Sequence, residues 1–443
     1  RAESKFDNPV QTTTTLDALN VNGYGIDFRG NDRLPSVTYP FDVTRAGVLN
    51  IVGVPRVASG TQPATIPNTT SSEIRIRPQG ANNTIDVGRV DLAWEVSPAF
   101  TAKGGIDYKK YQFDTFEFRR VNQNDTIFAP PVGTDINGLV STLSGFGNGL
   151  SLPSGVPTSW IIPNLGAIAD LYNIYCNCLQ SGPAGGPGDF TLSSTNNGNA
   201  RGNNRKVTER DRGWFVQGDF QGRLFDLPVR GNAGLRYVET KQSATGYQAT
   251  GGGTEVTVDQ SYDDWLPSGN IVFNLAPDLL LRFAGAKVMA RPQLGNLNPG
   301  GTISTTGNLA ITVGNPLLEP FRATTFDSNI EWYFDRNSLF GVGLFYKDIG
   351  TYIQTLRTNV PYNQTGLPLA LLPANFTGDE VFQVTTPVNT PGGKLTGIEL
   401  NYQQQFNFLP GIGRNFGTLL NYTYVKSQIE YQVSPTSTTT ITD

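Results

Sequence analysis

Histidine is absent from the chain of 443 residues, and this absence excludes several kinds of chemistry. Without an imidazole there is no Ser-His-Asp triad, no His general base and no His-ligated metal. Cysteine is almost absent too: Cys176 and Cys178 are the only thiols, and two thiols alone cannot hold a structural zinc ion. We therefore expect no metal, no other cofactor and no enzyme activity.

Charged residues are also scarce. They make up 16% of the sequence, against roughly 25% in a typical soluble domain, and the net charge is −4. This balance offers no basic surface, so we expect no nucleic-acid partner. Nowhere do about 18 apolar residues follow one another, which argues against a transmembrane helix. A barrel strand needs only about 9–11 alternating residues, so a membrane is not excluded.

The sequence is rich in apolar–polar alternation with a period of two, which is typical of strands with one apolar face. About eleven strands are expected, over residues 17–28, 84–96, 100–118, 213–225, 228–242, 263–275, 279–288, 326–334, 340–347, 395–406 and 416–428. Several are longer than the roughly five or six residues usual in globular proteins.

Short turns alternate with long connections along the chain. The turns are expected near residues 97–100, 226–228, 276–278, 335–338 and 408–414. The long connections, rich in Gly, Asn, Thr and Pro, span residues 29–82, 121–212, 246–260, 291–320 and 355–393. Short and long connections therefore lie at opposite ends of the strands. Outer-membrane barrels have this asymmetry, with short periplasmic turns and long extracellular loops, whereas soluble sandwiches use short loops throughout.

Four of the five tryptophans occupy strand ends and share the parity of the apolar residues. Trp94 and Trp332 precede short turns, whereas Trp214 and Trp265 follow long connections. Such rings collect at both water–lipid boundaries of membrane barrels, because the ring is apolar while its N–H needs a polar partner. The four side chains predict an interfacial aromatic girdle; the alternative is that they lie in the core of a soluble sandwich.

The opposite parity carries charges of both signs, which suits a polar interior. The lumen-facing polar residues predicted in this way are Arg89, Asp91, Glu95, Lys103, Asp107, Arg230, Arg236, Arg282, Asp327 and Glu331. In a sandwich they would face solvent, but a sandwich does not explain the asymmetry of the connections. The predicted fold class is therefore all-β: an incomplete transmembrane antiparallel β-barrel with long extracellular loops.

Two segments resemble the barrel of TonB-dependent outer-membrane receptors. They are WLPSGNIVFNLAPDLLLRFAGAKVMARPQLGNLNPG and the following VGNPLLEPFRATTFDSNIEWYF, in which the ARP and GNP spacings are the most specific features. The likeness spans roughly residues 83–430. It implies a barrel of about 22 strands in the bacterial outer membrane, surrounded by lipid and filled by an N-terminal plug. It also implies that a TonB complex acts through the plug to import a scarce nutrient.

The sequence departs from the family pattern at both ends. No plug or TonB box is recognisable, the closing C-terminal strands are missing, and the start at Arg1 lacks Met and a leader. We therefore expect the central part of a longer receptor. The expected organisation is an N-terminal strand and long extracellular loop over 1–82, barrel strands over 83–430, and the start of a further extracellular loop over 431–443.

The connection 121–212 is the expected ligand-binding region. It contains a helix predicted around Leu165–Tyr172 with Asn164 as N-cap. The ligand-binding candidates are the aromatic side chains of Trp160, Tyr172 and Tyr175, which suit stacking on sugar rings or planar groups; alternatively they pack the loop on itself. Cys176 and Cys178 either form a tight local disulfide or stay unbonded.

The adjacent acids Asp263 and Asp264 are the one pair that suggests catalysis, because glycoside hydrolysis uses two carboxyl groups. Neighbouring strand residues point to opposite faces, so these two cannot act together. The leading hypothesis is ligand-gated, TonB-coupled uptake of a small molecule or oligosaccharide, such as a glycan fragment or an iron chelate. The alternatives are a passive porin or structural surface barrel, and a secreted β-sandwich adhesin or glycan-binding module that would purify without detergent.

Overall fold

The computed structural model describes residues 1–18, 21–30, 33–53, 72–121, 125, 127–152, 155–180, 188–247, 255–305, 308–365, 369, 372, 376–434 and 437–442. Parts of all five expected long connections, and of the expected final loop, lie outside these residues. The chain divides into two compact units. The sheet unit comprises Arg1–Lys5, Ala81–Thr115 and Gly202–Asp443, and the lobe comprises Phe6–Gly80 and Phe116–Arg201.

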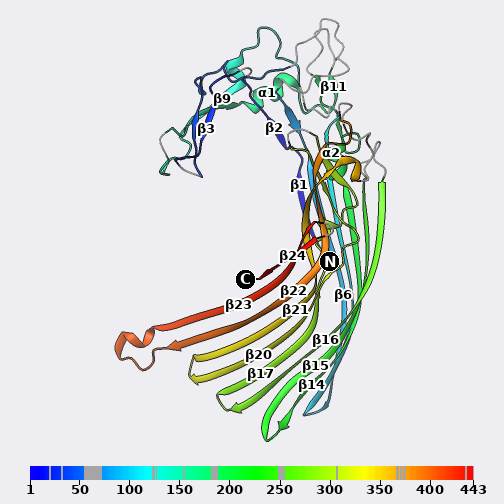
Figure 1. The fold of residues 1–443 in the computed structure, drawn as a ribbon, viewed down its shortest axis with the longest axis vertical. Coiled ribbons are helices and arrows are strands. Elements are labelled where there is room, and N and C mark those ends of the chain that lie inside the picture. Colours follow the sequence, from blue (N-terminus) through cyan, green and yellow to red (C-terminus); the bar gives the residue numbers. More distant parts are fainter. Residues whose placement is uncertain are drawn as a thin grey trace. The chain divides into compact units, whose positions relative to one another are not determined.

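One 14-stranded sheet forms the sheet unit (Figure 1). Its main path runs β1-β6-β7-β14-β15-β16-β17-β20-β21-β22, and β22 also pairs with β23, which pairs with β24. The bounds are β1 (Ala2–Asn8), β6 (Gln79–Ser97), β7 (Phe100–Glu117), β14 (Arg205–Leu224), β15 (Leu227–Tyr247), β16 (Glu255–Ala276), β17 (Leu279–Ala290), β20 (Phe321–Asp335), β21 (Ser338–Pro361), β22 (Val381–Gln405), β23 (Gly417–Ser434) and β24 (Ser437–Thr442). From β7 to β24 every pairing along this path is antiparallel, as predicted.

The short turns lie where the sequence predicts them. Phe225 and Asp226 join β14 to β15 with φ of 53° and 63°. Two consecutive left-handed residues form the turn that matches the twist of a two-residue hairpin. Pro98–Ala99, Pro277–Asp278 and Arg336–Asn337 make the other two-residue turns. The connection at 408–414 contains the 3-10 helix Gly411–Asn415.

At the long-connection end, several predicted boundaries are wrong. In the described part of the segment 17–28 the only strand is β3 (Gly25–Asp27), and the first strand of the large sheet is β1. The connections expected at 246–260 and 355–393 are shorter, because β15, β16, β21 and β22 run into them. Thr, Gly and Pro in these segments indicate loops locally, yet their backbone pairs with a neighbouring strand. The expected final loop, 431–443, instead contains the end of β23 and β24.

The two faces of the sheet differ in the way the sequence predicts. We call the face that carries Trp214 and Trp265 the outward face, and the opposite one the inner face. On the outward face of β20, Phe326, Ile330 and Trp332 are 56%, 39% and 47% exposed. On the inner face of β14, Asp211 is 1% exposed. Apolar side chains are thus the accessible ones and acids the buried ones, the reverse of a soluble protein.

The lobe has its own apolar core. Ile74, Ile168, Tyr172 and Phe190 are all fully buried there. The helix α1 (Leu165–Tyr172) begins at Asn164, whose side chain accepts a hydrogen bond from Ala167 N, as predicted. Short elements complete the lobe: β2 (Thr12–Thr14), β3 (Gly25–Asp27), β4 (Ser36–Thr38), β5 (Ile74–Ile76), β8 (Arg119–Arg120), β9 (Val140–Leu143), β10 (Trp160–Pro163), β11 (Leu179–Gln180), β12 (Gly188–Asp189) and β13 (Leu192–Ser193).

Arg120 and Asp125 are among the ionisable groups buried within the described part of the lobe. The Arg120 guanidinium lies 4.4 Å from the Phe190 ring centroid and donates hydrogen bonds to the carbonyls of Asp189 and Ile74, at 2.9 and 3.0 Å. Burial lowers its pKa to about 10. Burial also raises the pKa of the Asp125 carboxyl to about 6, although Arg120, Arg77 and Arg75 act in the opposite direction.

The raised pKa of Asp125 predicts a pH-dependent stability of the lobe. Between about pH 4, where an unfolded Asp titrates, and pH 6, the folded state holds a proton that the unfolded state has lost. Stability therefore falls as the pH rises through this window and levels off above it. Hydrogen exchange of the Ile74 amide, which donates to Asp125 O, measures the effect. Asp125→Asn should abolish this window, whereas the exposed Asp170→Asn should retain it.

The outward face predicts a second, independent result. Ile330→Arg places a charge on that face between Leu281 and Val342 of the neighbouring strands. In hydrocarbon this costs about 2–4 kcal/mol. The free energy of unfolding from lipid vesicles should fall by that amount, and much less for Asp327→Arg on the inner face. Equal losses for the two variants would contradict the assignment of the faces.

Candidate functional site

The inner face of the sheet carries ion pairs that reach across strands. Asp107 on β7 accepts two hydrogen bonds from Arg236 Nη2 on β15, at 2.8 and 2.9 Å. The strand between them presents Gly213, where an added Cβ would lie 2.9 Å from Asp107 Oδ1. The absence of a side chain at this position therefore lets the carboxylate and the guanidinium meet over β14.

Arg291, just after β17, is the centre of a polar cluster with two buried acids on the inner face. Its guanidinium lies 3.4 Å from Glu209 Oε1 and 3.1 Å from Asp211 Oδ1, and it donates to Thr240 Oγ1. Gln242 donates to the other Glu209 oxygen at 2.7 Å. Both carboxylates are buried, so the single guanidinium is their main compensation for lost hydration.

Arg322 repeats this arrangement on β20. It donates to Asp264 Oδ1 at 2.6 Å and to Glu319 Oε2 at 2.7 Å. The pairing of β20 with β21 is irregular between Arg322 and Ala323. The side chain of Arg322 reaches Asp264, which has inner parity on β16. Asp263, by contrast, is exposed and has outward parity, so the two adjacent acids do point to opposite faces.

The connection between β17 and β20 packs on the inner face of the sheet unit. Leu297 and Leu318 join Val207 and Ala244 in a buried apolar cluster. The connection includes the 3-10 helix Leu294–Leu297 and the hairpin of β18 (Gly301–Ser304) and β19 (Ala310–Val313), and β19 pairs in parallel with β22. This long connection is therefore part of the inner wall and not a free external loop.

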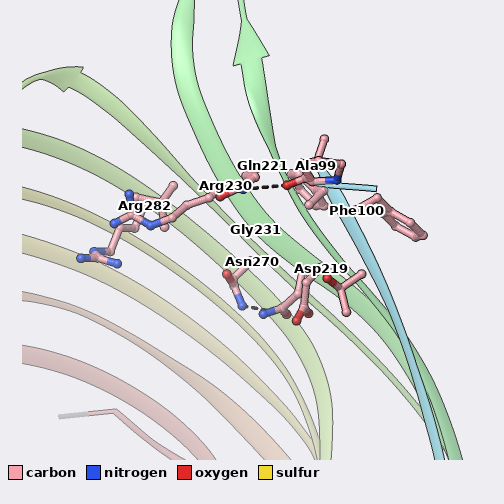
Figure 2. Close-up of a pocket in the computed structure, with 13 residues that line it drawn as sticks. Ala99, Phe100, Asp219, Gln221, Arg230, Gly231, Asn270 and Arg282 are labelled. Atoms are coloured by element: carbon pink, nitrogen blue, oxygen red, sulfur yellow. Dashed lines mark hydrogen bonds between the residues drawn. The ribbon is translucent and has the colours of Figure 1, made fainter. Parts of the chain in front are cut away.

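A cavity of about 440 Å³ opens on the inner face near the short turns (Figure 2). Asn270 donates to Asn232 Oδ1 at 2.9 Å, and Gln221 donates to the Pro98 carbonyl at 2.8 Å. Arg230 and Arg282 contribute guanidinium groups to the same lining. Its volume is typical of a small-molecule site, and its amides and guanidiniums suit a hydrophilic ligand or a hydrated path.

Seven of the ten polar residues that the sequence predicted form ion pairs on this wall. Arg282 forms a two-point pair with Glu331, at 2.9 and 3.1 Å. The other pairs are Arg89 with Asp91, Lys103 with Asp219, and Asp107 with Arg236. Glu95 is exposed and Asp327 half-buried. The role of these polar residues toward a ligand stays a prediction. The interfacial role of the four girdle tryptophans stays a prediction too; Trp94, one of them, is exposed.

The three aromatic candidates in the lobe have different environments. Tyr172 is fully buried and donates to the Phe128 carbonyl at 2.8 Å, so the expectation that it binds ligand is wrong. Its helical spacing turns it into the core beside Ile168. Trp160 is half-buried against Phe146, with ring centroids 5.2 Å apart, and Tyr175 is exposed. Cys176 and Cys178 form a disulfide.

Sequence reasoning missed two groups of residues. The acids Glu209 and Asp211 share the inner parity of Phe215 and extend the predicted strand upstream, a signal that was available. The row Tyr24–Tyr39–Phe41, with ring centroids 5.5 and 6.0 Å apart, comes from the first long connection of the lobe. No period marks it in the sequence.

The described residues contain neither a helix that could span a membrane nor a cluster of metal ligands. Within the ranges that the structure describes, no helix is long and apolar enough to cross a membrane. In those same ranges, no group of three or more His, Cys, Asp or Glu side chains is arranged to hold a metal ion.

An antiparallel sheet with an accessible apolar face and an ion-paired inner face defines a wall of an outer-membrane type of barrel. The family described as "TonB dependent receptor-like, beta-barrel" matches residues 7–442. The chain belongs to this family, whose members are bacterial outer-membrane receptors and not enzymes. The expectation drawn from the ARP and GNP motifs is confirmed.

Solved structures of related shape include three transporters. The unliganded ferric citrate transporter FecA is 15% identical, with a TM-score of 0.37, and the match covers 80% of this chain and 37% of that one. The FrpB iron transporter from Neisseria meningitidis is 12% identical, with a TM-score of 0.39, and the match covers 82% of this chain and 42% of that one. The copper transporter OprC is 13% identical, with a TM-score of 0.40, and the match covers 83% of this chain and 40% of that one. The chain thus spans about two fifths of these structures. No curated protein sequence matches it.

The Arg291 cluster yields a prediction about the inner connection. Arg291→Met leaves Glu209 and Asp211 without their guanidinium, a change that costs about 3–5 kcal/mol for a fully buried pair and less here, because Arg291 is partly exposed. We expect faster hydrogen exchange at the amides of Gly300 and Asn315, which are bonded within this connection. The turn variant Arg336→Gln serves as control. Unchanged exchange in Arg291→Met would show that the connection is held by its apolar contacts alone.

Proposed function

We propose that the protein carries out ligand-gated, TonB-coupled uptake of a small hydrophilic molecule across the outer membrane. The observation that carries the proposal is the pairing of an apolar outward face with an inner face of buried, cross-strand ion pairs. Such a wall separates hydrocarbon from a polar interior through which a hydrophilic solute can pass. Family membership supports the coupling to a TonB complex.

The polar inner cavity supports a ligand rich in hydroxyl or carboxylate groups, such as a glycan fragment or a chelate of iron. Amide and guanidinium groups line it, and both donate hydrogen bonds to such oxygens. In the lobe, the exposed Tyr175 and the half-buried Trp160 supply aromatic surface for a first encounter. The row Tyr24–Tyr39–Phe41 adds further aromatic surface.

Uptake of labelled ligand by cells that express the full-length receptor tests the proposal. A panel of oligosaccharides and ferric chelates is supplied to cells with and without a functional TonB complex. We expect saturable uptake of one class, lost when TonB is removed. Uptake that rises linearly with concentration and persists without TonB would instead indicate a passive pore.

The loop aromatics are tested in the same cells. The double variant Trp160→Ala and Tyr175→Ala should weaken ligand binding by roughly tenfold, as expected for the loss of two stacking contacts. Leu179→Ala, a change at another exposed side chain of the lobe, should leave binding unchanged. Full affinity in the double variant would remove these two rings from the site.

A further inference from the structure

Three cations lie side by side on the outward face near the long-connection end of the strands. Arg210 on β14 is in register with Lys110 on β7 and with Lys241 on β15. Arg212, two residues along β14, has the same parity. We call these four side chains the cationic row. All four lie in the sheet unit, and all have the parity of Trp214.

Two of these four cations, Lys110 and Arg210, have no carboxylate in register with them. Among the described residues, only Lys241 has a recorded ion pair, with Glu239 at 3.1 Å. Arg212 lies in register with Glu239, and Glu239 with Asp263, whereas at the level of Arg210 the three neighbouring positions Lys110, Arg210 and Lys241 are all cationic. Like charges directly opposite each other destabilise a sheet. The inner face, by contrast, places a carboxylate beside Arg236, Arg282, Arg291 and Arg322.

The position of the cationic row along the strand points to its counter-ion. Trp214, Tyr237 and Trp265 contact one another on the same face, with centroids 4.9 to 6.0 Å apart. Such rings mark the edge of the hydrocarbon. Arg210 lies four residues beyond Trp214, about 13 Å along a strand, and about 9 Å along the membrane normal for a strand tilted by about 45°. That is the depth of the lipid headgroups.

We propose that the cationic row binds the phosphate of an outer-leaflet lipid headgroup. Guanidinium and ammonium groups are the usual protein donors to phosphate. The neighbouring apolar surface suits the acyl chains of the same lipid. It includes the exposed side chains of Ile106, which is in register with Trp214, and of Val216, two residues further along β14. A free anion would contact only the cationic side chains, whereas a lipid would contact the cationic side chains with its phosphate and the apolar surface with its acyl chains. The site is separate from the inner face, so it does not depend on which ligand is transported.

Native mass spectrometry of the full-length receptor in neutral detergent tests the proposal. The probes are phosphatidic acid, the corresponding diacylglycerol that lacks the phosphate, and inorganic phosphate. We expect phosphatidic acid to bind roughly tenfold or more tightly than diacylglycerol, with a preference that falls at high salt. The triple variant Lys110→Gln, Arg210→Gln and Lys241→Gln should lose this preference.

The matched control removes three cations elsewhere in the sheet unit, by Arg336→Gln, Lys394→Gln and Lys426→Gln, and should keep the preference. Heat-modifiable mobility on a gel verifies that each variant is folded. If the triple variant is not folded, the single variant Arg210→Gln takes its place in the experiment. Equal binding of the two lipids overturns the proposal, and so does a preference that is insensitive to salt. The proposal is also overturned if the variants of the cationic row keep the preference for phosphatidic acid, or if the control variant loses it. Displacement of the lipid by equimolar inorganic phosphate overturns it as well.

Discussion

The structure depends on one constraint: a strand that faces hydrocarbon must pair its backbone with both neighbours and turn only apolar side chains outward. From β14 to β22 each strand along this path pairs antiparallel with a neighbour on both sides. Because side chains alternate along a strand, an apolar outward face leaves every other residue for the inner face. The polar side chains of these strands are therefore placed on the inner face, while the apolar ones form the outward face.

Charges on the inner face are stabilised by partners on other strands of the sheet that lie diagonally to them. Asp107 and Arg236 meet across Gly213, and Arg282 meets Glu331 on the adjacent strand. Arg291 compensates two acids at once and also fastens the connection that packs over them. The outward cationic row differs, because among the described residues only its Lys241 has such an ion-pair partner, Glu239. The contrast between the two faces is what assigns a lipid phosphate to it.

Local patterns in the sequence predict much of the sheet but not its long-range partners. Alternation locates the long strands, the turn residues mark the short connections, and Asn164 marks the start of α1. The ends of β21 and β22 were missed, because Thr and Pro segments become strands only when a neighbour supplies the pairing. The burial of Tyr172 depends on Ile74 and Phe190, which are distant in sequence. The lobe itself could not be predicted for the same reason, because its core is formed by two segments that are separated in the sequence, Phe6–Gly80 and Phe116–Arg201.

The central claim is that the apolar parity faces lipid and the polar parity faces water. Single Cys residues at 326–332 of β20, in the full-length receptor in lipid bilayers, can carry spin labels because the two native thiols are joined in a disulfide. Oxygen, which partitions into lipid, should relax labels at Phe326, Ser328, Ile330 and Trp332, whereas a water-soluble nickel chelate should relax those at Asp327, Asn329 and Glu331. The opposite alternation, or none at all, would contradict the account.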